Sequence, residues 1–130
     1  AQEAALKFKE TCGLHAEAYS SAEVQHGPMA LVGPGFPVLA LAQPDRSGAG
    51  TVEVAAQFAW RGAAVWVATS PGLASAVHPA VHLPQVAVAD PALAPMVTLQ
   101  SFYRAINALA LRRGRNPDLP PHLHKITETM

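Results

Sequence analysis

Two carboxylates and a lysine share one face of the first helix that the sequence predicts. Glu3, Lys7 and Glu10 stand at i, i+4 and i+7, and the 3.6-residue period places them on a stripe about 60° wide. A carboxylate held in a defined position can transfer a proton, provided its pKa lies close to the working pH. The same spacing is typical of a solvated stripe in which Glu3 supports Lys7 through an i, i+4 ion pair. Spacing alone leaves both interpretations open.

The helix that carries this stripe is predicted over residues 1–14 and ends near Gly13, a residue able to adopt the left-handed conformation. Its opposite face is apolar, which predicts the burial of Ala1, Ala4, Ala5, Phe8 and Cys12. Cys12 is therefore expected to be a buried, inert thiol. A short second helix is predicted from the capping-box sequence Ser20-Ser21-Ala22-Glu23 to His26, where Gly27-Pro28 ends it.

Strands and longer helices alternate in the rest of the chain. Residues 36–42 and 63–69 are predicted as buried parallel strands, and residues 82–88 as a weaker strand that Pro84 favours at an edge. Helices are predicted over residues 49–61 and 95–113, the second from the recurrence of Met96, Leu99, Tyr103, Ile106 and Ala110. This order predicts an α/β domain with a mostly parallel sheet, which binds ligands at the carboxyl ends of its strands.

Composition limits the classes of function. The chain has 130 residues, enough for one domain, and its nine acidic and nine basic residues give a net charge of +0, which argues against nucleic-acid and membrane-surface partners. One cysteine excludes an internal disulfide and fits a reducing, cytoplasmic compartment. No apolar run is long enough for a membrane span. The histidines lack metal-ligand spacing, so we expect neither a metal nor a cofactor.

Three segments resemble the second sugar isomerase (SIS) domain of the phosphosugar isomerase family. They are ALKFKET-x3-HAEAYSSAEVQHGP near the start, GFPVLALAQPD at residues 35–45, and NPDLPPHLHKITETM at residues 116–130. The family includes the isomerase half of glucosamine-6-phosphate synthase and bacterial amino-sugar-phosphate deaminase/isomerases. The resemblance implies a three-layer α/β sandwich over residues 1–114, incomplete at its N-terminus because no strand precedes the first helix. Residues 115–130, which include three prolines, would form an active-site tail.

The resemblance also implies a role for several side chains. Glu10 matches the family glutamate that moves a proton between C1 and C2 of the sugar. His26 matches the histidine that opens the sugar ring in the neighbouring subunit's active site, which implies a homodimer; histidine titrates in the range that ring opening requires. Lys125 matches the lysine of the loop that closes over the sugar, where it can stabilise an oxyanion or form a Schiff base.

Glu3 and Lys7 match positions that line the same pocket, and His124, which precedes Lys125, is expected to bind the substrate with them. Each assignment has a structural alternative. Glu10 could be a surface glutamate beside Lys7, His26 could cap its short helix, and Lys125 could be an exposed lysine in a polar tail.

One expected feature of the family is missing from these residues. The family holds the sugar phosphate with a Ser/Thr-rich loop at a helix N-terminus, and that loop belongs to the first SIS domain. We therefore expect this chain to be half of an active site, inactive by itself, with the first SIS domain as its partner.

Three functions stay open: an amino-sugar-phosphate deaminase/isomerase, the isomerase part of a glutamine-fructose-6-phosphate aminotransferase, and a phosphosugar-sensing module without activity. The presence of Glu10, His26 and Lys125 argues against the third, because a sensor needs no acid/base set. The sequences of the end motifs resemble those of the deaminase/isomerases more closely than those of the synthase.

Overall fold

The computed structural model describes residues 1–70, 73, 77 and 79–122 of the chain. The contacts divide the chain into two units. Ala1 and Tyr19–Leu99 form the first, called here the sheet unit; Gln2–Ala18 and the residues from Gln100 onward form the second, called the helix unit. In the described part of the chain, no helix combines the length and the apolar character needed to cross a membrane.

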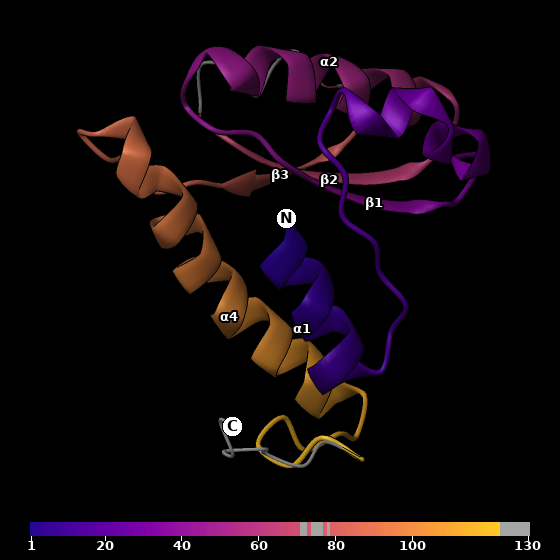
Figure 1. Cartoon of the computed structure of the whole chain (residues 1–130), viewed down its shortest axis with the longest axis vertical. Helices are drawn as coiled ribbons and strands as arrows, with labels where there is room; N and C mark the ends of the chain where they lie inside the picture. Colours follow the sequence, from indigo (N-terminus) through magenta and orange to yellow (C-terminus); the bar gives the residue numbers. More distant parts are fainter. Residues whose placement is uncertain (71–72, 74–76, 78, 123–130) are drawn as a thin grey trace, which may run out of the picture. The chain divides into compact units, whose positions relative to one another are not determined.

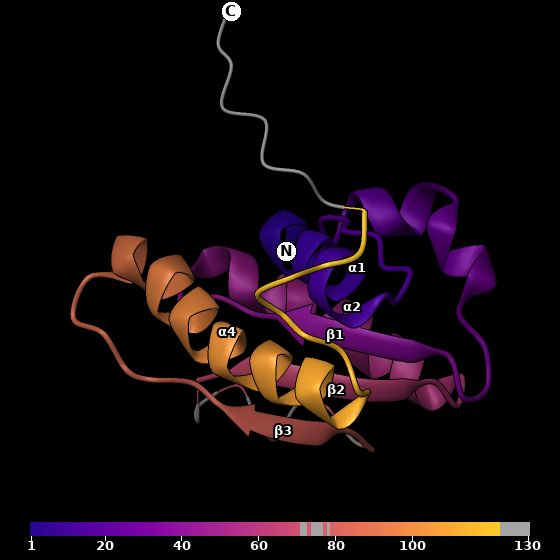
Figure 2. The same cartoon turned by 90° about the horizontal axis from the view of Figure 1, so that it is seen from below.

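Three parallel strands form the sheet of the sheet unit. β1 (Pro37–Leu41), β2 (Ala64–Thr69) and β3 (Val81–Pro84) lie side by side in that order (Figure 2). The three predicted parallel strands are confirmed, and so is the edge position of the third. The predicted burial of the first is not, because β1 forms the other edge of the sheet and only Ala40 of its residues is buried. β3 is shorter than predicted, because its last pairing joins Thr69 to Pro84, beyond which β2 offers no further partner.

The helix α2 (Arg46–Trp60) covers one face of this sheet (Figure 1). Its buried residues Val52, Ala55 and Phe58 pack with Val65 and Val67 of β2 into the larger core cluster. The helix begins three residues before the predicted start. Asp45 caps the helix by accepting hydrogen bonds from the backbone N–H and the hydroxyl of Ser47 at 2.8 and 2.6 Å. The sequence pattern missed this start because the glycines in the first turns of the helix weaken the helical signal.

The segment before β1 forms two short 3₁₀ helices, η1 (Glu23–His26) and η2 (Pro28–Leu31). The predicted capping box is confirmed: the N–H of Ser20 donates to Glu23 Oε2 at 2.9 Å, and the N–H of Glu23 donates to Ser20 Oγ at 3.1 Å. Val24 and Met29 pack against the core of the sheet unit. These two apolar contacts hold the segment against the core.

Two helices make up the helix unit. α1 (Gln2–Cys12) packs against the second half of α4 (Ala94–Arg112) through a small core of Cys12, Ile106 and Ala110 (Figure 1). Gly13 ends α1 with φ +58°, as predicted. The division between the units falls within α4, after Leu99, and a 3₁₀ turn, η3 (Pro91–Leu93), precedes α4.

The buried face of α4 agrees only in part with the predicted one, which included Ile106 and Ala110 but also Met96 and Tyr103. Thr98, Ile106 and Ala110 are buried, whereas Met96 and Tyr103 are exposed by 61% and 37%. The apolar recurrence of the sequence fits two overlapping stripes. The buried stripe is the one with i, i+4 spacing through Thr98, Phe102, Ile106 and Ala110.

Candidate active site

The predicted polar stripe of α1 forms an ion-pair cluster. Lys7 Nζ lies 2.8 Å from Glu10 Oε2 and 3.6 Å from Glu3 Oε1. The Glu10 and Lys7 side chains are about one quarter exposed, 22% and 30%, and the Glu3 side chain is 37% exposed. The ammonium group is thus held between two carboxylates at a surface that a ligand can reach.

The surroundings of Lys7 favour its charged form. Its hydrogen bond to Glu10 raises the pKa of Lys7, the charges of Glu10 and Glu3 act in the same direction, and partial burial opposes them. Lys7 therefore stays an ammonium ion at neutral pH. In this state it can stabilise a negative charge that develops on a substrate oxygen.

A tyrosine from α4 completes the cluster. The hydroxyl of Tyr103 donates a hydrogen bond to Glu3 Oε1 at 3.0 Å. This bond raises the pKa of Tyr103, and the charge of Lys7 acts in the opposite direction. The sequence pattern placed Tyr103 in the apolar stripe of its helix and missed this contact. The signal was its phenolic hydroxyl, which needs a polar partner even where the ring packs.

The packing of α1 against α4 sets the geometry of the cluster. The rings of Phe8 and Phe102 meet edge to face with their centroids 5.5 Å apart. Cys12 is wholly buried, as predicted, and its thiol donates to the carbonyl of Ile106 at 3.6 Å. Arg113 Nε donates to the carbonyl of Cys12 at 3.0 Å. These contacts fix the register of the two helices and with it the position of Tyr103 beside Glu3.

His26 belongs to the sheet unit, at the end of η1, and its side chain is exposed. Gly27 follows it with φ +148°, a conformation open mainly to glycine, and turns the chain into η2. The structure therefore presents the His26 imidazole to solvent. Its predicted function in a neighbouring subunit stays a prediction, as does its combination with the Glu10 cluster.

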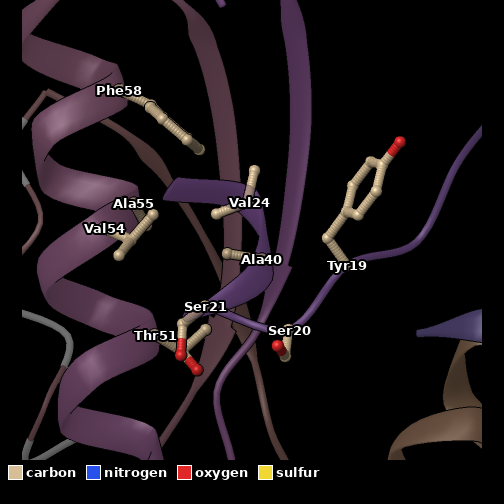
Figure 3. Close-up of a pocket in the computed structure, with 9 residues that line it drawn as sticks. All are labelled: Tyr19, Ser20, Ser21, Val24, Ala40, Thr51, Val54, Ala55 and Phe58. Atoms are coloured by element: carbon tan, nitrogen blue, oxygen red, sulfur yellow. The ribbon is translucent and has the colours of Figure 1, made fainter. Parts of the chain in front are cut away.

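A small hollow lies beside the His26 segment, between η1 and α2. Its volume is about 120 Å³, and Figure 3 shows Val54, Ala55 and Phe58 of α2 facing Val24 of η1 across it. The hydroxyls of Ser20, Ser21 and Thr51 lie at one end of the hollow (Figure 3). The hollow is too small for a sugar phosphate, since ligand pockets usually measure roughly 300–1,000 Å³.

The remaining predicted site residues, His124 and Lys125, lie outside the described residues. Within the described ranges, no group of three or more His, Cys, Asp or Glu side chains could hold a metal ion.

Two buried polar atoms lie near the carboxyl edge of the sheet. Thr69 ends β2 with 4% exposure, and Gln43 follows β1 by two residues. In the part of the chain that the structure describes, neither Thr69 Oγ1 nor Gln43 Oε1 has a hydrogen-bond partner. Open parallel sheets bind ligands at this edge, but neither atom is accessible from solvent here.

Comparison with known protein families identifies the family to which this parallel α/β fold belongs. The chain belongs to the SIS domain family, whose model matches residues 1–112. Among curated proteins, it resembles the glutamine–fructose-6-phosphate aminotransferases of Pyrobaculum aerophilum and Rhizobium meliloti, with 36% identity over 128 residues and 32% over 126. Each match covers 96% of the chain and 21% of the relative, so the chain spans about a fifth of the length of these relatives.

Two solved structures resemble the chain closely. A presumed phosphosugar isomerase from Silicibacter pomeroyi is 46% identical with a TM-score of 0.78, over 90% of this chain and 34% of that one. The C-terminal domain of glucosamine-fructose-6-phosphate aminotransferase from Francisella tularensis is 26% identical, also with a TM-score of 0.78, over 88% of this chain and 33% of that one. The predicted family and the predicted α/β fold are therefore confirmed.

Proposed function

We propose that this chain is the phosphosugar-binding SIS domain of a larger enzyme that isomerises sugar phosphates, with Glu10 as the proton-transferring group. The observation that carries the proposal is the Lys7–Glu10 pair at 2.8 Å on an accessible face of α1. It brings together a carboxylate, which can remove and return a proton, and an ammonium group, which can stabilise the charge left behind.

The chemistry can be followed atom by atom. Isomerisation of a 2-ketose removes a proton from C1 and returns it at C2, while the hydroxyl proton moves between the two oxygens. Glu10 would carry the carbon-bound proton. The Lys7 ammonium would stabilise the oxyanion of the enediolate that forms between the two steps, because its charge is already in place when the oxyanion appears.

The other predicted residues would complete this site from elsewhere. Glu3 would accept hydrogen bonds from sugar hydroxyls, His26 would open the sugar ring in a neighbouring subunit, and Lys125 would close over the sugar with His124 beside it. The phosphate would bind to a separate, first SIS domain. The complete enzyme would then be at least a homodimer, in which residues 115–130 act as the active-site tail.

The comparisons support two alternative reactions for the complete enzyme. Identity of 46% with a presumed phosphosugar isomerase favours a phosphosugar isomerase. The curated relatives at 32–36% identity favour the isomerase domain of a glutamine–fructose-6-phosphate aminotransferase. The deaminase reaction expected from the end motifs is supported by that resemblance alone and stays a prediction.

The proposal is tested with Glu10→Gln in the full-length protein. We expect kcat for isomerisation of fructose 6-phosphate or glucosamine 6-phosphate to fall by roughly 10²–10⁴, the usual scale for a lost general base. Calorimetric titration should show nearly unchanged binding of the sugar phosphate.

Glu53→Gln is the matched control, because Glu53 is an exposed carboxylate on α2 and has no proposed role. It should leave both kcat and binding unchanged. Turnover by Glu10→Gln close to that of the wild type would exclude Glu10 as the proton-transferring group.

A further inference from the structure

The Glu3 carboxylate has two donors from two different helices. Its Oε1 accepts the hydrogen bond of the Tyr103 hydroxyl at 3.0 Å and lies 3.6 Å from the Lys7 ammonium. Lys7 lies much closer to Glu10, at 2.8 Å. Of the two donors, Tyr103 therefore makes the shorter contact with Glu3.

Charge explains why Lys7 lies closer to Glu10 and Tyr103 makes the shorter contact with Glu3. Two carboxylates compete for one ammonium group, and the shorter contact goes to Glu10. The side chain of Glu3 is more than one third exposed, so without a second donor its long side chain would sample several rotamers. A neutral hydroxyl fixed on another helix restricts it without neutralising its charge.

Tyr103 is held in place by its neighbours on α4. Phe102, one residue earlier, packs edge to face on Phe8 of α1, and Ile106 is buried against Cys12. Successive residues of a helix point about 100° apart, so these anchors leave Tyr103 at the rim of the interface. Its ring is partly exposed, and its hydroxyl reaches the first turn of α1.

We propose that Tyr103 is a positioning residue of the candidate active site: its hydroxyl holds the Glu3 carboxylate in the orientation that accepts hydrogen bonds from the hydroxyls of a sugar phosphate. This inference depends on the proposed function, in which Glu3 binds the substrate. It predicts that Tyr103 acts on substrate affinity, whereas proton transfer by Glu10 proceeds without it.

The contact itself can be tested without any activity. In ring-¹³C-labelled full-length protein, the signal that Tyr103→Phe removes is assigned to Tyr103. The hydrogen bond to Glu3 raises the pKa of Tyr103, so Glu3→Gln should lower that pKa toward the ordinary tyrosine value of about 10. The control Glu53→Gln should leave it unchanged. An identical Tyr103 titration in the wild type and in Glu3→Gln would overturn the proposal.

The role is tested by kinetics of the full-length protein. Tyr103→Phe removes only the hydroxyl, and we expect it to raise KM by about 3- to 10-fold while kcat stays within about twofold, the scale of one hydrogen bond. In a Glu3→Ala background the same change should have almost no further effect, because alanine leaves no acceptor for the Tyr103 hydroxyl. A merely structural role would lower the melting temperature and raise KM equally in both backgrounds.

The outcomes separate the two proposals. A wild-type protein inactive on sugar phosphates would overturn the proposed function and the role inferred for Tyr103 with it. Normal wild-type activity together with an unchanged KM in Tyr103→Phe would overturn the inference alone. Equal effects of Tyr103→Phe in the wild-type and Glu3→Ala backgrounds would also overturn it.

Discussion

Two buried threonines of the sheet unit differ in their hydrogen bonds. Thr98 Oγ1 accepts a hydrogen bond from Gln85 Nε2 at 2.9 Å, whereas Thr69 Oγ1 has no partner among the described residues. The two side chains are 8% and 4% exposed, so burial does not distinguish them. A buried hydroxyl without a partner loses its hydration and gains nothing in return.

We therefore predict opposite effects of the same substitution. Thr69→Val should leave the free energy of unfolding unchanged or raise it by up to about 1 kcal/mol, because valine replaces an unpaired hydroxyl and favours a strand. Thr98→Val should lower it by about 1 kcal/mol, since Gln85 loses its acceptor. Urea denaturation of the two variants measures the difference. A clear loss of stability in Thr69→Val would reveal a hydrogen-bond partner for Thr69 beyond the described residues.

At the scale of elements, the start of α2 shows how closely a helix can approach a strand end. A Cβ added to Gly48 would collide with the backbone carbonyl oxygen of Gln43, just after β1. Gly50, two residues later in the same helix, has room: the nearest atom to its added Cβ is Ser21 Oγ at 3.8 Å. Helix propensity treats the two positions alike, so their difference arises from tertiary packing.

Alanine at these two glycines should therefore have opposite effects. Gly50→Ala should raise the free energy of unfolding by about 0.5–1 kcal/mol, the usual gain of alanine over glycine inside a helix. Gly48→Ala should lower it by roughly 1–3 kcal/mol, because the helix must move away from β1. Thermal or urea unfolding of both variants measures this. Stabilisation by Gly48→Ala would contradict the close approach.

The N-terminal cap of α2 should make stability depend on pH. Hydrogen bonds from the hydroxyl and the backbone N–H of Ser47 lower the pKa of Asp45 below its ordinary value of 3.8. A lowered folded-state pKa contributes stability above the unfolded-state value, and this contribution is lost as pH falls through the folded-state pKa. The loss should therefore appear below about pH 3.8.

Asp45→Asn isolates this effect, because asparagine also caps helices but does not ionise. The stability difference between the wild type and Asp45→Asn should be constant from pH 7 to pH 5 and should decrease below pH 3.8. Melting temperatures recorded across this range test the expectation. A constant difference down to pH 2 would show that the Asp45 carboxylate does not cap as an ion.

At the scale of the whole molecule, the chain spans about a fifth of its curated relatives, and its predicted site residues lie in separate parts of it. Glu10 belongs to the helix unit and His26 to the sheet unit. The resemblance predicts that His26 serves the active site of a neighbouring subunit. The proposed homodimer would then contain two sites, each built from both subunits.

Mixing two inactive variants of the full-length protein tests the shared site. Glu10→Gln and His26→Ala are combined under conditions that allow subunit exchange. Each mixed dimer would keep one site with both wild-type groups, so about a quarter of the wild-type activity should return at equal mixing in a symmetric dimer. Each variant alone, taken through the same exchange, is the control. Complete inactivity of the mixture, despite mixed dimers detected by native mass spectrometry, would exclude the shared site.

Local patterns in the sequence were sufficient for most of the elements and for three of the four residues of the ion-pair cluster, all but Tyr103. Successive turns of α1 carry Glu3, Lys7 and Glu10 on one face, so the helical period alone predicted that these side chains lie together. The capping box of η1 and the glycine that ends α1 depend on neighbouring residues and were likewise predicted. The start of α2 was missed, since glycines near a helix start weaken the pattern from which a helix is recognised.

Tertiary structure alone decided which partner each polar side chain finds across the chain. Tyr103 donates to Glu3 over a separation of 100 residues, and Thr98 receives a hydrogen bond that Thr69 lacks. Likewise, packing buried Thr98 with Ile106 and Ala110 and left Met96 exposed, although the sequence pattern grouped Met96 with the latter two. The periodicity of a sequence shows which side chains share one face of a helix or strand. Which faces of two elements meet depends on the register in which the elements pack. That register is set by the fit of side chains such as Phe8 and Phe102, which only the folded chain brings together.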